Sequence, residues 1–274
     1  MILISNLNVL YTQLDKITLG FYEENIEEVA YYGVAQKVMS IMMAIIMSIV
    51  RVMMPRLSFY LGEGNKLEYE RLLNKTFPYI YLLIFPISVG IGILSKEIAL
   101  FFGGIGYLEA QGVIIAFGIR LVAAVIEYIL INQVIFLNQK EKAIILIYII
   151  GGEINFILKV VLIKFHILIG TTAILTTMIS EIVLIVIEYF YIKKYLDIKL
   201  EVFKIRNIKY LLVALLFIPT KYILNDLSYG VIMNLIIVFI ACSITYFILL
   251  FITKDEYVIE ILNRVNIKKY MVKK

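Results

Sequence analysis

The chain has 274 residues, of which 62% are hydrophobic and only 17% are charged, and its mean hydropathy is +0.94. These values exclude a soluble globular domain and indicate an integral membrane protein. The net charge of +5 does not indicate nucleic-acid binding, because Lys and Arg lie mainly in short connections and near the C-terminal end, without forming a basic amphipathic face. The single cysteine, Cys242, excludes an internal disulfide bond.

The first predicted helix runs from about Met1 to Phe21 and is a poor hydrophobic segment. With residues placed 100° apart, five of its polar residues fall within an arc of about 100°, and the opposite side is mostly Leu and Ile. These five residues are Ser5, Asn8, Thr12, Asp15 and Lys16. We therefore expect a helix with one face toward water.

The second predicted helix runs from about Ala30 to Pro55, after an acidic turn. Small residues with a basic residue near each end follow one of its faces: Gly33, Lys37, Ser40, Ala44, Ser48 and Arg51. Such a stripe either lines a cavity or forms a close helix contact, in which case Arg51 extends to the lipid headgroups.

Six further membrane spans follow, at about Thr76–Leu94, Glu109–Leu137, 143–163, Ile169–Tyr191, Tyr210–Leu224 and Val231–Ile252. Arg56–Asn74 is expected to be a polar connection, Ser95–Leu108 a turn at the membrane surface, and Lys254–Lys274 a basic tail. Pro86 predicts a kink within the third span. The eighth span carries no charge, so the last two spans are expected to pack at the edge of the bundle.

The distribution of basic residues orients these eight spans. Seventeen Lys and Arg residues lie in the connections after spans two, four and six and in the C-terminal tail, against three (Lys96, Lys164 and Lys221) in the opposite connections. Because basic loops stay on the cytoplasmic side, this asymmetry predicts that both chain termini are cytoplasmic.

Ionisable residues inside apolar helices are costly and usually mark a substrate or ion path. The candidates for substrate binding are Lys16, Lys37, Arg51 and Arg120, and the candidates for ion coupling are Asp15, Glu127, Glu153 and Glu181. We expect Asp15, Lys16 and Lys37 to form one layer near the outer end of the bundle. Arg120 and Glu127 are seven residues apart on one face, which predicts either an internal ion pair or two groups facing the cavity.

No catalytic residue, metal site or cofactor is predicted. The sole histidine, His166, lies at a membrane edge without a second His or Cys beside it. The residues favour instead the passage of an anionic headgroup in exchange for ions or protons.

Several stretches resemble, in the same order, the second half of bacterial polysaccharide flippases of the multidrug/oligosaccharidyl-lipid/polysaccharide exporter superfamily. They are TQLDKITLG at 12–20, YYGVAQK at 31–37, MPRLS at 54–58, FPISVGIGILSKEI at 85–98, FFGG at 101–104, and HILIGTTAILTTMISE at 166–181. The resemblance implies translocation of undecaprenyl-diphosphate-linked oligosaccharide repeat units across the bacterial cytoplasmic membrane, for O-antigen, capsule or exopolysaccharide assembly.

Family members usually have two six-helix lobes around a central cavity, and this chain resembles helices seven to fourteen. The resemblance therefore implies a second six-helix lobe at residues 1–192. It also implies a segment at 193–274 that contains a basic connection, two additional helices and the tail. The first lobe is missing, so we expect a separately encoded lobe or self-association, besides contact with membrane lipids, to complete the transporter.

Two other functions remain open on the sequence. A drug or cation antiporter of the same superfamily would need an acidic cavity that prevails over Lys16, Lys37 and Arg120. A membrane glycosyltransferase or polymerase would need a catalytic cluster in a sizeable external loop, and the longest predicted external connection has only about fifteen residues. The chain is therefore expected to be a transporter and not an enzyme.

Overall fold

The computed structural model describes residues 13–21, 26–224 and 230–271, and within these ranges the chain forms helices and connections without a β-strand. Seven helical segments in the described ranges are long and apolar enough to cross a membrane. They coincide with the second to eighth predicted spans, which confirms an all-α polytopic membrane bundle. The first predicted span lies largely outside the described residues, of which 13–21 are helical.

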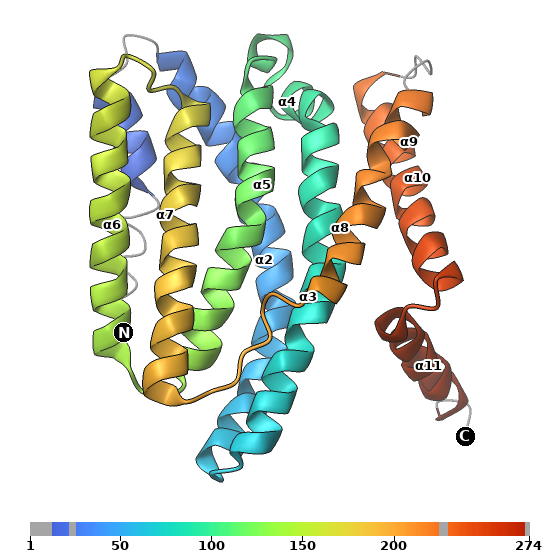
Figure 1. Cartoon of the computed structure of the whole chain (residues 1–274). Helices are drawn as coiled ribbons and strands as arrows, with labels where there is room; N and C mark the ends of the chain where they lie inside the picture. The colour runs from blue at the N-terminus through green and yellow to red at the C-terminus, as the bar shows by residue number, and fades with distance from the viewer. Residues whose placement is uncertain (1–12, 22–25, 225–229, 272–274) are drawn as a thin grey trace.

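The long helices lie side by side (Figure 1) and are α2 (Ile26–Gly62), α3 (Lys66–Ile93), α5 (Ala110–Ile129), α6 (Glu141–Lys164), α7 (Gly170–Tyr191) and α10 (Val231–Ile252). The shorter helices are α4 (Ser95–Gly103), α8 (Ile208–Leu215), α9 (Phe217–Leu224) and α11 (Glu256–Met271). Two π-helical segments, Leu130–Phe136 and Ile192–Leu196, extend α5 and α7, and two 3₁₀ turns occupy Ile105–Tyr107 and Ile205–Asn207.

Helix α5 forms the centre of the bundle and packs against α2, α3 and α7, while α6 packs on α7. The α3–α5 contact is close because residue 118 is glycine. A Cβ atom at Gly118 would lie 3.1 Å from the backbone oxygen of Ser88, and the Ser88 hydroxyl donates a 2.7 Å hydrogen bond to the Gly118 carbonyl. Small residues commonly allow such close approach between helices within membranes.

The predicted polar connection Arg56–Asn74 is wrong. Helix α2 continues to Gly62 and α3 begins at Lys66, so the two helices form a hairpin that extends beyond the neighbouring helices at the lower end of Figure 1. The segment is polar but rich in Leu, Glu, Lys and Arg, which are strong helix formers. It therefore stays helical although its hydropathy is low. Asn65 caps α3 by accepting a hydrogen bond from the backbone N–H of Glu68.

The predicted surface turn Ser95–Leu108 is instead mostly helical. It folds as α4 followed by the 3₁₀ turn at Ile105–Tyr107. Gly104 ends α4 with φ of 74°, a positive value that glycine adopts without steric cost.

The last two spans pack beside α3 and α4, at the edge of the bundle, as the absence of charge from the eighth span predicted (Figure 1). The seventh span is divided into α8 and α9 near Leu216. Pro219 explains the break, because it has no N–H to donate to the carbonyl of Leu215. The predicted basic tail contains the helix α11, which is held to α3 by hydrogen bonds from Lys75 and Tyr79 to Glu260, of 2.8 and 2.6 Å.

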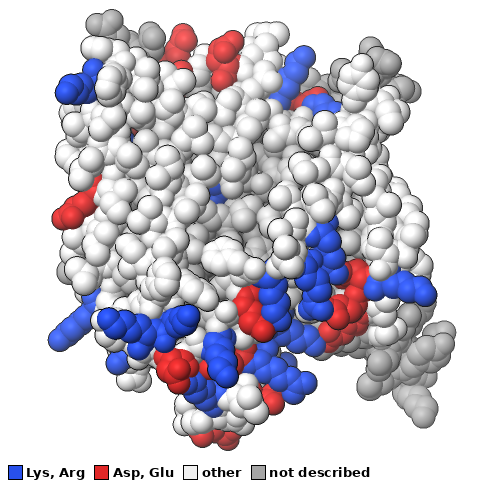
Figure 2. Space-filling model, viewed as in Figure 1, with Lys and Arg blue, Asp and Glu red and all other residues white. Residues whose placement is uncertain are grey.

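Charged side chains gather at the two ends of the bundle. Figure 2 shows a broad band with few charges between them, and a dense group of Lys, Arg, Asp and Glu at the lower end. This is the distribution expected of a multi-pass membrane protein. The side of the membrane on which each terminus lies stays a prediction.

Candidate functional site

An ion pair between Asp15 and Lys159 lies fully buried between the helix of residues 13–21 and α6. The Lys159 ammonium lies 2.5 Å from Asp15 Oδ1, and both side chains have no exposed surface. Two hydroxyl groups also donate to the Asp15 carboxylate: Tyr32 of α2 at 2.5 Å and Thr177 of α7 at 2.8 and 2.9 Å. One carboxylate therefore joins four helices.

Asn155 completes this network from one turn before Lys159 on α6. Its side-chain oxygen accepts a 2.6 Å hydrogen bond from Lys159, and its amide donates to Thr177 at 3.2 Å. Because buried polar groups are costly unless they are hydrogen-bonded, this saturation explains why an ion pair is tolerated inside the bundle.

The expected layer of Asp15 with Lys16 and Lys37 does not form. Neighbouring residues of a helix point about 100° apart, so Asp15 points into the bundle while Lys16 points elsewhere. Lys159 was the residue missed as the partner of Asp15. The only sequence signal was the spacing of four residues between Asn155 and Lys159, which places them on one face of α6.

A second buried ion pair joins α5 to α7. The Arg120 guanidinium donates two hydrogen bonds to the Glu181 carboxylate, at 3.0 Å from Nε and 2.5 Å from a terminal nitrogen. Of the two alternatives for Arg120 and Glu127, an ion pair between them is therefore wrong. Seven residues separate the two along α5, which is about 10 Å, too far for a direct ion pair, whereas Glu181 approaches from the neighbouring helix.

The two remaining carboxylates proposed for ion coupling lie in different environments. Glu127 is buried on α5 and hydrogen-bonds to Tyr148 of α6. Glu153 is exposed on the outer face of α6. The structure thus brings Asp15, Glu127 and Glu181 into the interior of the bundle and leaves Glu153 outside it.

Lys16 and Lys37 line one open cavity of about 410 Å³. The other residues that line this cationic cavity are Ala30, Gly33, Val34, Gln36, Ser40 and Phe102. None of these described lining residues is a carboxylate. The small-residue stripe of α2 therefore lines a cavity at Gly33 and Ser40, whereas Arg51 lies further along α2 and donates a 3.3 Å hydrogen bond to the Tyr128 hydroxyl.

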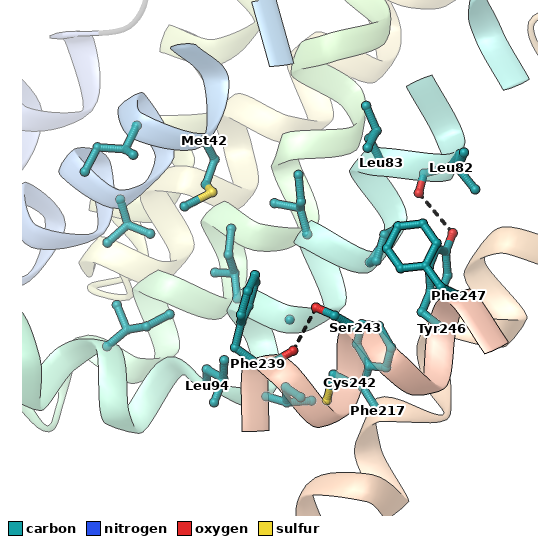
Figure 3. A pocket seen from close by; sticks show the side chains of 18 of the residues that line it. Met42, Leu82, Leu83, Leu94, Phe217, Phe239, Cys242, Ser243, Tyr246 and Phe247 are labelled. Carbon is teal, nitrogen blue, oxygen red and sulfur yellow. Dashed lines mark hydrogen bonds between the residues drawn. The ribbon is translucent and has the colours of Figure 1, made fainter. Parts of the chain in front are cut away.

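A second, apolar cavity of about 380 Å³ lies between α2, α3, α4, α9 and α10 (Figure 3). Phe217, Phe239 and Phe247 contribute to its wall. The polar atoms of its labelled residues are already engaged: the Ser243 hydroxyl donates to the Phe239 carbonyl at 2.8 Å, and the Tyr246 hydroxyl donates to the Leu82 carbonyl at 3.0 Å. Sequence reasoning missed this cavity, because five helices contribute to it.

The two cavities are neighbours, because Phe102 of α4 lines both of them. On α2, Val38, Ile41 and Met42 of the apolar cavity adjoin Lys37 and Ser40 of the cationic cavity in sequence. A positively charged space and a hydrocarbon-lined space therefore meet across one aromatic side chain.

Comparison with known proteins adds one match. A family model described as "Polysaccharide biosynthesis protein" matches residues 1–112, and no curated protein matches the chain. The matched region contains Lys16, Lys37 and Phe102 and extends to the start of α5. With the seven candidate spans, the match supports a membrane protein of polysaccharide biosynthesis.

Proposed function

We propose that this membrane protein of polysaccharide biosynthesis translocates oligosaccharides linked to undecaprenyl diphosphate across the bacterial cytoplasmic membrane. The observation that carries this proposal is the contact, through Phe102, between the cationic cavity of Lys16 and Lys37 and the apolar cavity beside α10. A lipid-linked oligosaccharide has the matching chemistry, because an anionic diphosphate separates its hydrocarbon chain from its sugars.

Lys16 and Lys37 are suited to the diphosphate. Each ammonium group offers three hydrogen-bond donors and a positive charge, and hydrogen bonds between charged partners are the strong ones. Neither lysine forms a salt bridge with a carboxylate among the described residues. The apolar cavity is suited to part of the hydrocarbon chain, since its wall offers hardly any free polar group.

Arg120 contributes differently from the two lysines in this proposal. Its guanidinium is already bound to Glu181 inside the bundle, so it positions α5 against α7 and does not contact the substrate. Arg51 is exposed on the side of α2 and is a candidate for contact with substrate or with lipid headgroups.

Translocation also requires a partner for the exposed polar face of α2. Transporters of this kind open alternately to either side when one helical bundle moves against another around the site. We infer that a separately encoded lobe or a second copy of this chain covers the cationic cavity on its open side. The lipid-linked oligosaccharide and this second bundle are therefore the partners proposed for the chain.

A drug or cation antiporter is less well supported, because Lys16 and Lys37 would repel a cationic substrate and no carboxylate among the described residues lines their cavity. We also propose that the chain is a transporter and not an enzyme, since the two cavities offer charge and shape for binding.

Deletion of the gene in its native host tests the proposal. We expect lipid-linked oligosaccharide to accumulate in the membrane, and expression of the wild-type chain to relieve the accumulation. The double variant Lys16→Gln/Lys37→Gln should fail to relieve it, whereas the control Lys96→Gln/Lys164→Gln, which changes two lysines outside the cavity, should succeed. Unchanged lipid-linked oligosaccharide together with increased drug sensitivity after deletion would contradict the proposal and favour the antiporter.

A further inference from the structure

Two glutamates lie at the same depth in the interface between α5 and α7. These helices pack together and run in the same direction (Figure 1), and Arg120 of α5 binds Glu181 of α7. Glu127 follows Arg120 by seven residues, and Glu188 follows Glu181 by the same number. Seven residues are about two helical turns, so both glutamates lie roughly 10 Å beyond the ion pair on the facing sides of the two helices.

Glu188 is fully buried, and neither of its carboxylate oxygens has a hydrogen-bond partner within the described part of the chain. Glu127 is 9% exposed and hydrogen-bonds to Tyr148 of α6. Of these two carboxyl groups, one therefore has a hydroxyl partner and the other has no hydrogen-bond partner among the described residues.

The buried basic groups of the described chain are already neutralised. They are Arg120 and Lys159, which pair with Glu181 and Asp15. On α2, Arg51 is exposed and hydrogen-bonds to Tyr128, the neighbour of Glu127 on α5. Residues 1–12 contain no Lys, Arg or His.

Among the described residues, the other titratable groups that face the two glutamates are Arg120 from α5, Tyr148 from α6 and Glu181 from α7. Arg120 is bound to Glu181, and Tyr148 is a neutral donor. Two facing carboxylates in this buried interface cannot both be ionised, because burial and mutual repulsion both oppose the second charge.

We propose that Glu127 and Glu188 form a proton-binding site in which the two carboxyl groups hold a proton inside the bundle. Proton binding is a property of this chain alone. Coupling of that proton to transport rests on the function proposed above, in which loss of the proton on one side of the membrane changes the packing of α5 against α7.

A proton fits this pair better than a metal ion. Hard metal ions such as Ca²⁺ and Mg²⁺ require about six oxygen ligands. The oxygens of Glu188 have no hydrogen-bond partner in the described chain, and the described residues contain no group of three His, Cys, Asp or Glu side chains that could hold a metal. A proton requires only the two carboxyl groups.

Infrared spectroscopy of the purified full chain in lipid nanodiscs tests the site. At neutral pH the wild type should show the carbonyl stretch of a protonated carboxyl group, and this band should shift in D₂O. The double variant Glu127→Gln/Glu188→Gln should lose the band and remain folded, because glutamine has nearly the shape of a protonated glutamate. The control Glu153→Gln, which changes the exposed glutamate of α6, should keep the band.

A wild-type spectrum without such a band at neutral pH would overturn the inference whether or not the variants fold. A band that disappears when Na⁺ is added at constant pH would also overturn it, because the pair would then be a cation site. The proposed function has a separate readout: a chain that shows the band but transports no lipid-linked sugar keeps the proton site and loses the transport proposal. A chain that transports the lipid-linked sugar but shows no band keeps the transport proposal and loses the proton site.

Discussion

Asp15 and Lys159 form an ion pair with no exposed surface, and the 2.5 Å contact between them ties the helix of residues 13–21 to α6 across the interior of the bundle. The pair removes two charges from the candidate transport path. Lys16, the next residue in the chain, lines the cationic cavity together with Lys37. Two consecutive residues of one helix therefore belong to a structural ion pair and to a candidate substrate site.

Replacing only one residue of this ion pair should destabilise the protein strongly. We expect Lys159→Met to lower the free energy of unfolding by about 3–5 kcal/mol, because the Asp15 carboxylate would stay buried without its counter-ion. The double variant Asp15→Leu/Lys159→Met should recover most of this loss, since both buried charges are then removed. Denaturant titration of the purified chain in detergent measures both effects, and a single variant as stable as the wild type would show that the pair is dispensable.

The docking of α11 should depend on pH through Asp255. Burial raises the pKa of this carboxyl group, but hydrogen bonds from Lys209, from the backbone N–H of Val258 and from Tyr210 outweigh it and lower the pKa below its ordinary value. Asp255 also caps α11, accepting 3.0 Å hydrogen bonds from the backbone N–H groups of Tyr257 and Val258.

The stabilisation by a carboxylate with a lowered pKa is present above its ordinary pKa, about 4, and is lost as the pH falls through the lower folded value. Hydrogen exchange of α11 should therefore accelerate in strongly acidic solution. Asp255→Asn should accelerate it at neutral pH and remove this contribution to the acid dependence. Exchange in Asp255→Asn that still follows the wild-type acid profile would show that another group controls the docking.

Filling the apolar cavity should impair transport without unfolding the protein. Ser243 lines the cavity and its hydroxyl bonds only to its own helix, so Ser243→Trp places a large ring in the space with little loss of hydrogen bonding. We expect transport to fall by roughly tenfold or more, since a few CH₂ groups excluded from an apolar site weaken binding by about 2 kcal/mol.

The matched control is Ile248→Trp, which adds the same ring on an exposed position of α10 outside the cavity. Accumulation of lipid-linked oligosaccharide in complemented deletion cells reports transport, and membrane protein levels report folding. Full transport by Ser243→Trp at normal levels would exclude the cavity as the site of the hydrocarbon chain.

Labelling with a membrane-impermeant maleimide tests the orientation predicted from the basic residues. In a Cys242→Ala background, Glu109→Cys near the start of α5 should react in intact cells, because it is predicted to be external. Glu63→Cys in the turn between α2 and α3 should react only after the membrane is permeabilised. The reverse pattern would invert the topology, and with it the side on which the cationic cavity opens.

Hydropathy predicted the seven described spans well, because a helix inside lipid must be both long and apolar. The same signal missed α11 and the extension of α2 and α3, where the helices leave the apolar layer and their residues become polar. It also missed α4, because nine residues are too few to register as a span.

The candidate site was predicted in part. Helical spacing indicated that Lys37 and Ser40 share a face, and both do line the cationic cavity with Lys16. The partners of Asp15 and Arg120 were not predictable from spacing, since Lys159 and Glu181 come from other helices. Spacing along one helix defines a face but gives no information on which helix packs against it.

The central claim is tested most directly by translocation in inverted membrane vesicles from the native host, with labelled lipid-linked oligosaccharide supplied on the exposed cytoplasmic face. Vesicles that contain the wild-type chain should carry the label to the lumen. Vesicles without the chain should not. In vesicles with Lys16→Gln/Lys37→Gln the amount of label in the lumen should fall by roughly tenfold or more, because two charged hydrogen-bond donors are lost. Equal translocation with and without the chain would contradict the account.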